Sequence, residues 1–114
     1  MERSPMAAQS YCPLFLKDGF KMVPVHPSDI VFIQICDNYA HVILTNGKQM
    51  IRSTIKDIEQ KLVYFNCFCR VHRSYLINLQ HVKHIERGVI NMGKFDIPLH
   101  MTYAPSFLEK LLIL

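Results

Sequence analysis

The sequence predicts a mostly β domain of short antiparallel sheets, with one helix in the middle of the chain and one at its C-terminal end. Runs of β-branched and aromatic residues alternate with turn dipeptides such as Asn46-Gly47 along most of the chain. Helical spacing of apolar residues appears at only two places, residues 55–63 and 102–114. A chain of 114 residues is expected to form one domain and can bury a core without disulfides.

The N-terminal part should be a lead followed by a β-hairpin. Residues 1–12 show no periodicity and are expected to be flexible, ahead of a single domain over residues 13–114. Asp18-Gly19 then lies between the β-forming runs Leu14–Lys17 and Phe20–Pro24, which is a hairpin signal.

A short helical turn and two strands are expected next. Ser28 or Asp29 should cap the turn. Ile30–Cys36 is mostly apolar and β-forming, which indicates a buried strand, and Asp37-Asn38 then reverses the chain. Alternate residues of the strand Tyr39–Thr45 fall on opposite faces, with Ala40, Val42 and Leu44 on one and Tyr39, His41, Ile43 and Thr45 on the other.

The middle of the chain predicts a hairpin and then a helix. Asn46-Gly47 is the strongest hairpin signal and should pair the preceding strand with Lys48–Arg52. Ser53-Thr54 has the composition of a helix cap. A helix over about residues 55–63 follows from the apolar spacing of Ile55, Ile58, Leu62 and Phe65.

Residues 65–79 interleave apolar and cationic side chains and form the most unusual segment of the sequence. In an extended conformation one face should carry Cys67, Cys69 and Val71, and the other Phe68, Arg70 and His72. Arg73-Ser74 follows where this strand should end, and Asn78 is suited to cap a short turn.

The last third predicts three short strands and a helix. The strands are expected at Val82–Glu86, Val89–Met92 and Phe95–Pro98, joined by turns at Arg87-Gly88 and Gly93-Lys94. A terminal helix over residues 102–114, interrupted near its start by Pro105, should pack through Leu108, Leu111 and Leu112.

The charge distribution permits an anionic partner. The formal net charge is only +4, but the segment from Lys48 to Lys94 holds nine cations against three acids. No apolar run is long enough to span a membrane, and residues 1–10 lack the apolar core of a signal peptide. The protein is therefore expected to be cytoplasmic, with reduced cysteines and no membrane partner.

Catalysis and metal binding have weak support. No paired carboxylates, glycine-rich phosphate loop or Ser-His-acid arrangement is present. The Cys67-x-Cys69 pair followed by His72 leaves open a zinc or ligand sensor or a cysteine nucleophile, but it lacks Cys-x-x-Cys spacing and a second ligand pair. Core cysteines on a strand face are the favoured interpretation, so no enzyme activity and no cofactor are expected.

Binding remains as the function class that the residues favour. Arg70, His72 and Arg73 on one strand and turn, with Asn38, Tyr39 and His41 at another, have the donors that contact phosphates and base edges. The alternative is that Arg70 and Arg73 are solvated charges and His72 is a hydrogen-bonded structural residue. Residue types alone do not decide between the two.

Five motifs occur in a characteristic order. They are Asp29-Ile30-Val31-Phe32-Ile33, Asn38-Tyr39, Asn46-Gly47, Ile51-Arg52-Ser53-Thr54-Ile55 and Phe68-Cys69-Arg70-Val71-His72-Arg73-Ser74-Tyr75-Leu76-Ile77-Asn78. Over about residues 14–112 this order resembles the LytTR domain, the DNA-binding module of many bacterial response regulators. The last motif is the most specific, because it follows the family pattern in a single register.

The resemblance implies a sequence-specific regulator of transcription that binds double-stranded DNA. In the family, loops projecting from the sheets enter successive major grooves, and two domains commonly occupy direct repeats, so a second copy is an expected partner on DNA. The loop residues implied here are Asn38, Tyr39 and His41 in the first loop, His72 and Arg73 with Arg70 in the second, and His100, Met101 and Thr102 in the third.

Two features depart from the family. The third loop usually reads Pro-Val-Ser-Arg, whereas this chain reads Pro98-Leu99-His100-Met101, so methionine replaces the expected arginine. The chain also has no room for a receiver module, which makes it a stand-alone regulator or a fragment with a separate signalling partner. The alternative function is a protein-interaction module, derived from a LytTR domain, that has lost strong DNA binding.

Overall fold

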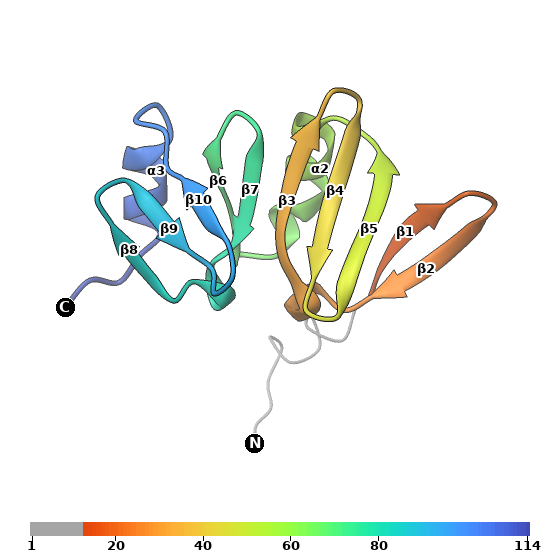
Figure 1. Ribbon diagram of the computed structural model, residues 1–114, viewed down its shortest axis with the longest axis horizontal. Helices are drawn as coiled ribbons and strands as arrows, with labels where there is room; N and C mark the ends of the chain where they lie inside the picture. Colours follow the sequence, from red (N-terminus) through yellow and green to blue (C-terminus); the bar gives the residue numbers. More distant parts are fainter. Residues whose placement is uncertain (1–12) are drawn as a thin grey trace, which may run out of the picture.

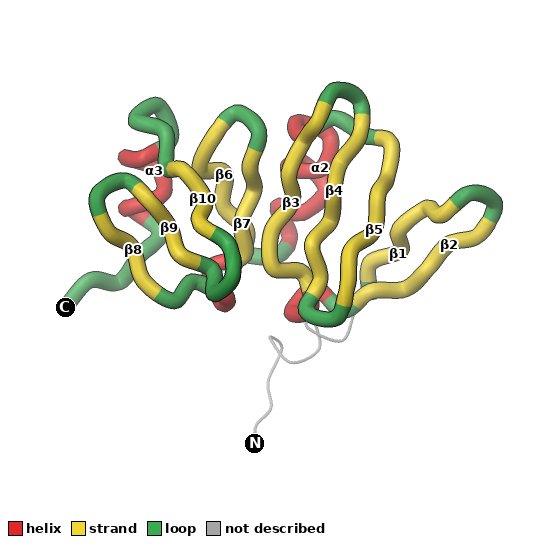
Figure 2. Tube along the Cα trace, in the orientation of Figure 1, coloured by secondary structure: helices red, strands yellow, loops and turns green. Residues whose placement is uncertain are grey.

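The computed structural model describes residues 13–114, and the predicted flexible lead, residues 1–12, lies outside the described residues. The strands are β1 (Leu14–Asp18), β2 (Lys21–Val25), β3 (Ile30–Cys36), β4 (Tyr39–Leu44), β5 (Gly47–Arg52), β6 (Phe68–His72), β7 (Tyr75–Asn78), β8 (His84–Glu86), β9 (Val89–Asn91) and β10 (Asp96–Pro98). The helices are α2 (Ile55–Lys61) and α3 (Ala104–Glu109), with 3₁₀ turns η1 (Pro27–Asp29), η2 (Leu62–Tyr64) and η3 (Leu79–His81). The mostly β fold is confirmed (Figures 1 and 2).

A central five-stranded sheet, in the order β5-β4-β3-β7-β6, organises the domain. The β1–β2 hairpin flanks it beside β5, and the three-stranded sheet β10-β9-β8 lies at the other end (Figure 1). All pairings are antiparallel, and paired strands that follow each other in the chain are joined by short turns at the sheet ends, whereas β3 and β7 pair across a long connection. The turns are therefore the segments that this fold presents to a partner.

The two faces of the central sheet are covered by separate hydrophobic cores. The first core joins the sheet to α2 and the β1–β2 hairpin, and it includes Ile58 and Leu62. The second joins the sheet to the three-stranded sheet and α3, and it includes Ile97 and the fully buried Phe107. A register shift at Val31 lets both Val31 and Phe32 enter the second core, although strict alternation would separate them.

Asn78 is the buried polar residue that ties β7 to the start of β3. Its Nδ2 donates to the carbonyl of Ile30 at 2.9 Å, and its Oδ1 accepts from the Gln80 N–H at 2.9 Å, which caps η3. The prediction that Asn78 caps a short turn is confirmed. Because the side chain is fully buried, both groups need these partners.

Several predicted boundaries hold. Thr54 caps α2 by accepting the Asp57 N–H at 3.1 Å, and the predicted helical spacing packs into the first core. The turns at Asp37-Asn38, Arg73-Ser74 and Arg87-Gly88 also lie where expected. At the last of these turns Arg87 and Gly88 both have positive φ, 52° and 76°, as a tight hairpin turn of the primed type requires.

Two hairpins turn one residue away from the prediction. The first turns at Gly19-Phe20 because Asp18 pairs with Lys21, and Gly19 supplies the positive φ of 65°. The second turns at Thr45-Asn46, with Gly47 as the first residue of β5. This register places the bulky Ile51 opposite the small Ala40. Such cross-strand packing influences the register and cannot be predicted from the Asn46-Gly47 dipeptide.

The cap of η1 and the surroundings of Cys67 also differ from the prediction. His26, not Ser28 or Asp29, caps η1, since its Nδ1 accepts the Ser28 N–H at 3.3 Å. Cys67 precedes β6 and packs against the first core, whereas Cys69 and Val71 belong to the second. The predicted face shared by all three is therefore wrong, because the strand begins only at Phe68.

The terminal helix is shorter than predicted, and of the three predicted packing residues only Leu111 packs against the core. Pro105 lies in the first turn of α3, where no N–H is needed, so it helps to begin the helix and does not interrupt one. Phe107 and Leu111, four residues apart, enter the second core. Leu108 and Leu112 are 46% and 91% exposed, so their predicted packing role is wrong. Among the described residues, no helix has the length and apolar character to cross a membrane.

Candidate nucleic-acid interface

Three connecting segments reach the same edge of the molecule. They are the β3–β4 turn, the β6–β7 turn and the β10–α3 loop, residues 99–103 (top of Figure 1). The Ile35 N–H donates to the carbonyl of Ser74 at 2.9 Å, which joins the first two segments. The His100 N–H donates to the carbonyl of Val71 at 2.8 Å, which joins the third to β6. Backbone hydrogen bonds thus set the spacing of all three.

Arg70 holds the β6–β7 turn in place. Its Nε donates to the carbonyl of His72 at 3.3 Å and its Nη2 to the carbonyl of Arg73 at 3.0 Å. Its guanidinium also lies 5.0 Å from the ring centroid of Tyr103 and 3.4 Å from Glu59. With its side chain only 20% exposed, Arg70 connects the second segment to the third and has little surface left for a ligand.

Arg73 has the opposite environment. It is exposed at the tip of the β6–β7 turn, and its carbonyl is held by Arg70. Within residues 13–114 its guanidinium makes no ion pair and donates no hydrogen bond. A fixed backbone with a free guanidinium is the arrangement that fork-like recognition of a phosphate or a guanine edge requires.

A common hydrogen-bonding pattern shapes the second and third segments. The Ser74 N–H donates to Nδ1 of His72 at 3.1 Å, and the Thr102 N–H donates to Nδ1 of His100 at 3.1 Å. We call each arrangement a His turn, residues 72–74 and 100–102. In each, the imidazole closes the turn and the middle residue, Arg73 or Met101, is exposed.

The two His turns touch through their imidazoles. The ring centroids of His72 and His100 are 5.9 Å apart and nearly perpendicular, at 87°. Burial lowers the pKa of His72, and the neighbouring His100, Arg73 and Arg70 lower it further. A neutral imidazole that accepts at Nδ1 carries its proton on Nε2, so each ring keeps one donor for a ligand.

A polar row crosses the sheet just below the turns. The strand registers place His41 opposite Gln34, Gln34 opposite Tyr75, and Tyr75 opposite His72. Gln34 Nε2 donates to the Tyr75 hydroxyl at 3.0 Å, and the His72 and Tyr75 ring centroids are 5.5 Å apart. Residues directly opposite in an antiparallel sheet share a face, so the row connects His41 to the His turns.

The structure therefore brings the predicted residues together at one edge. Asn38 and Tyr39 are exposed at the β3–β4 turn, and Tyr39 is opposite Arg52 of β5. His41 lies lower, in the half-buried polar row. Together with the two His turns and Arg70, this edge contains all nine predicted site residues, Asn38, Tyr39, His41, Arg70, His72, Arg73, His100, Met101 and Thr102.

Two further cations at this edge were not predicted as site residues. Arg52 ends β5 opposite Tyr39 and is exposed. Arg87 is exposed in the β8–β9 turn, where the neighbouring Gly88 carbonyl accepts the Leu99 N–H at 2.9 Å. The sequence marks Arg87-Gly88 as a turn, but only the packing of the small sheet brings it beside the third segment.

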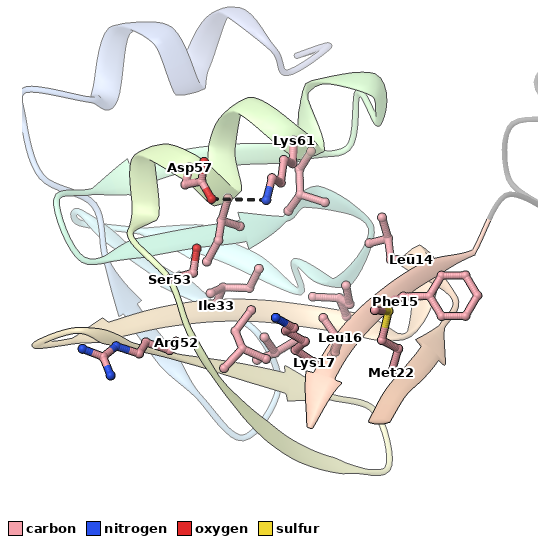
Figure 3. Close-up of a pocket in the computed structure, with 15 residues that line it drawn as sticks. Leu14, Phe15, Leu16, Lys17, Met22, Ile33, Arg52, Ser53, Asp57 and Lys61 are labelled. Atoms are coloured by element: carbon pink, nitrogen blue, oxygen red, sulfur yellow. Dashed lines mark ion pairs between the residues drawn. The ribbon is translucent and has the colours of Figure 1, made fainter. Parts of the chain in front are cut away.

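An apolar cavity of about 270 Å³ lies elsewhere, between the β1–β2 hairpin, the central sheet and α2 (Figure 3). Leu14, Leu16 and Ile33 line it, and the Asp57–Lys61 ion pair, at 3.3 Å, lies at its margin (Figure 3). None of the nine predicted residues lines this cavity. Of the residues named at the edge, only Arg52 lines it, so the cavity lies apart from the three connecting segments.

Cys67 and Cys69 are placed for packing more than for chemistry. Cys69 is buried and Cys67 half-buried, and this burial raises the pKa of both thiols. At neutral pH both thiols are therefore protonated, which makes them poor nucleophiles and poor metal ligands. Across residues 13–114, no group of three or more His, Cys, Asp or Glu side chains is arranged to hold a metal ion.

Comparison with known proteins gives the family and the fold. The family model described as "LytTr DNA-binding domain" matches residues 20–111, so the resemblance expected over about residues 14–112 is confirmed apart from β1 and the last residue. The chain is 32% identical over 105 residues to the sensory transduction protein LytT of Bacillus subtilis (strain 168), covering 87% of this chain but 43% of that protein. The chain thus spans less than half the length of this curated relative.

A solved structure shares the fold. The LytTr DNA-binding domain of a methyl-accepting/DNA response regulator from Bacillus cereus superimposes with a TM-score of 0.72, at 21% sequence identity, over 86% of this chain and 94% of that chain. This match supports the mostly β architecture, and the family model adds the sequence pattern over four fifths of the chain. The chain therefore belongs to the LytTR family of DNA-binding domains.

Proposed function

We propose that this chain binds double-stranded DNA sequence-specifically, with its three edge segments in successive major grooves, and that it regulates transcription in the cytoplasm. The observation that carries the proposal is the exposed Arg73, whose guanidinium has no ion-pair or hydrogen-bond partner among residues 13–114, on a turn whose backbone is braced by Arg70. The family assignment supplies DNA as the ligand class. The function needs no catalytic residue and no cofactor.

The nine residues divide into contact and support roles. Arg73 contacts a base edge or a phosphate, with Asn38 and Tyr39 contacting DNA from the first segment. His72 and His100 offer Nε2–H donors, and Thr102 offers its hydroxyl. Arg70 positions the turn and makes no primary contact, because its donors are used by the carbonyls of His72 and Arg73. His41 supports the edge through the polar row and contacts DNA only if the groove edge reaches that depth.

The wider setting is part of the same proposal. The relative from Bacillus subtilis is a sensory transduction protein of more than twice the matched length, so we propose that this chain is an output domain. It receives its signal from a separate partner or from segments beyond this chain. On DNA, two copies occupy a direct repeat, and residues 13–114 act as one domain.

Selection of bound duplexes from a random pool tests the proposal directly. A recovered direct repeat is the expected result, and it would establish both sequence specificity and the arrangement of two copies. Binding to the selected duplex should weaken steeply as salt concentration rises, because cationic side chains displace counterions from phosphates. Recovery of no preferred sequence at low salt would contradict the proposal.

A protein-interaction module is the second candidate function. Met101 favours it, because methionine cannot replace the phosphate or guanine contact of an arginine. Leu112 and Ile113, 91% and 70% exposed, provide an apolar surface that such a module would use. No duplex binding at low salt, together with a co-purifying protein, would favour this candidate over the first.

A further inference from the structure

The two His turns present their middle residues in the same way. In each, an imidazole Nδ1 accepts the N–H two residues ahead, at 3.1 Å in both cases. Each turn is followed by Tyr, namely Tyr75 and Tyr103, and the two imidazoles are in edge-to-face contact. Met101 therefore occupies in the third segment the place that Arg73 occupies in the second.

Met101 is an exposed apolar side chain in polar surroundings. It is 81% exposed, whereas its turn is held by the His100 N–H bond to the Val71 carbonyl at 2.8 Å. The residues before and after it in the chain are His100 and Thr102, which line a pocket together with Arg73. Exposed apolar side chains occur elsewhere on this domain too, so what distinguishes Met101 is its position, equivalent to that of Arg73 in the neighbouring turn.

The chemistry of the major groove limits which group of DNA the Met101 side chain can contact. Phosphates and guanine edges need a hydrogen-bond donor, which a thioether lacks. The C5-methyl group of thymine is the one apolar feature that the base pairs present in the major groove. An apolar side chain that packs against this methyl group therefore distinguishes A·T from G·C pairs without a hydrogen bond.

We propose that Met101 determines specificity by packing against a thymine methyl group, so that the third segment selects an A·T pair where an arginine would select guanine. This inference rests on the proposed DNA-binding function. The His turn of the second segment supplies polar recognition through Arg73, and the His turn of the third segment supplies apolar recognition through Met101. The third segment then still recognises a base pair, but a different one from that recognised by an arginine.

Selection from a random pool with three proteins tests the base preference. The wild-type chain should select A·T at one position of each half-site. Met101→Arg should select G·C at that position with about tenfold preference. Met101→Ala should lose the preference there and keep it elsewhere. The matched control is Met22→Ala, since Met22 is also an exposed methionine, on the β1–β2 hairpin, and should leave the selected sequence unchanged.

Uracil substitution tests the methyl contact itself. In the duplex selected by the wild-type chain, each thymine is replaced in turn by uracil, which lacks only the methyl group. One replacement should weaken wild-type binding about fourfold, the effect expected for one buried methyl group, and should not weaken Met101→Ala further. Equal binding at every uracil position, or an equal loss in Met101→Ala, would overturn the inference and leave the proposed function standing. A wild-type chain that selects no sequence would overturn both.

Discussion

The β6–β7 turn and the β10–α3 loop share a backbone arrangement and differ in chemistry. Both are closed by an imidazole that accepts an N–H two residues ahead, at the same distance of 3.1 Å. One exposes an arginine and the other a methionine. The histidine sets the shape of each turn by accepting a backbone N–H, whereas the middle residue sets what the turn can recognise. Substitutions of these two kinds should therefore have separable effects.

The largest difference between the two turns should appear on removal of Arg73. If Arg73 contacts a base, Arg73→Ala should weaken binding to the selected duplex by about 1–3 kcal/mol and relax one position of the site. Binding constants on selected and scrambled duplexes measure this. Lys94→Ala is the charge-matched control, because Lys94 is exposed at the β9–β10 connection, away from the edge. An equal loss on both duplexes would make Arg73 a phosphate contact, and undiminished binding would remove it from the site.

Arg70→Lys should next distinguish the support that Arg70 gives to the β6–β7 turn from the DNA contact that Arg73 makes. Lysine keeps the charge but cannot donate to the carbonyls of both His72 and Arg73 while stacking on Tyr103. The free energy of unfolding should fall by about 1.5 kcal/mol, and DNA binding should weaken because Arg73 is no longer held. Denaturant unfolding and duplex binding measure the two effects.

Glu59→Gln is the control for Arg70, since it removes only a partly exposed ion pair. It should change the free energy of unfolding by less than about 1 kcal/mol. A wild-type stability for Arg70→Lys would show that the turn does not depend on these two hydrogen bonds.

A smaller effect should follow from opening either His turn. His72→Ala and His100→Ala each remove one acceptor and should each reduce the free energy of unfolding by about 1 kcal/mol. Asparagine can accept the same N–H in an Asx turn, so His72→Asn and His100→Asn should retain much of that stability. Equal losses for the Ala and Asn variants would assign the effect to ring packing and not to the hydrogen bond.

The smallest expected effect is a pH dependence of stability from His72. Burial and the neighbouring His100, Arg73 and Arg70 lower its pKa in the folded state. As pH falls below about 6.5, the unfolded chain therefore takes up a proton before the folded chain does. The free energy of unfolding should decrease in that range, and the contribution of His72 should be complete above it. His72→Asn should flatten this part of the profile, and an unchanged profile would exclude His72 as the cause.

Much of the interface could be predicted from local pattern. The motif from Phe68 to Asn78 locates the β6–β7 turn, and tight-turn dipeptides locate Asp37-Asn38 and Arg87-Gly88 correctly. These features depend on residues within a few positions of one another. Residues 72–74 and 100–102 share the pattern His-x-Ser/Thr in the sequence. Only the structure shows that in both the imidazole accepts the backbone N–H of the third residue.

Other features could not be predicted because they depend on distant residues. Phe107, not Leu108, is buried in α3 because the second core lies on that side of the helix. Arg87 joins the edge because the Gly88 carbonyl pairs with Leu99. Arg70 is a support because Tyr103, 33 positions along the chain, lies under its guanidinium. Neither the periodicity of apolar residues nor the charge distribution predicts these contacts.

By itself, the sequence determined the family, the order of strands and turns, and the residue types offered to DNA. Side-chain periodicity and turn-forming residues act over a few positions, so strands and turns could be predicted from short stretches of the sequence. Only the tertiary structure decided that the Arg70 side chain is used to hold the β6–β7 turn, whereas that of Arg73 has no partner within the described part of the chain. It also decided that Met101 lies in the place equivalent to Arg73. The reason is physical: hydrogen bonds and ring contacts between separate strands assign each polar group a partner or leave it exposed to a ligand.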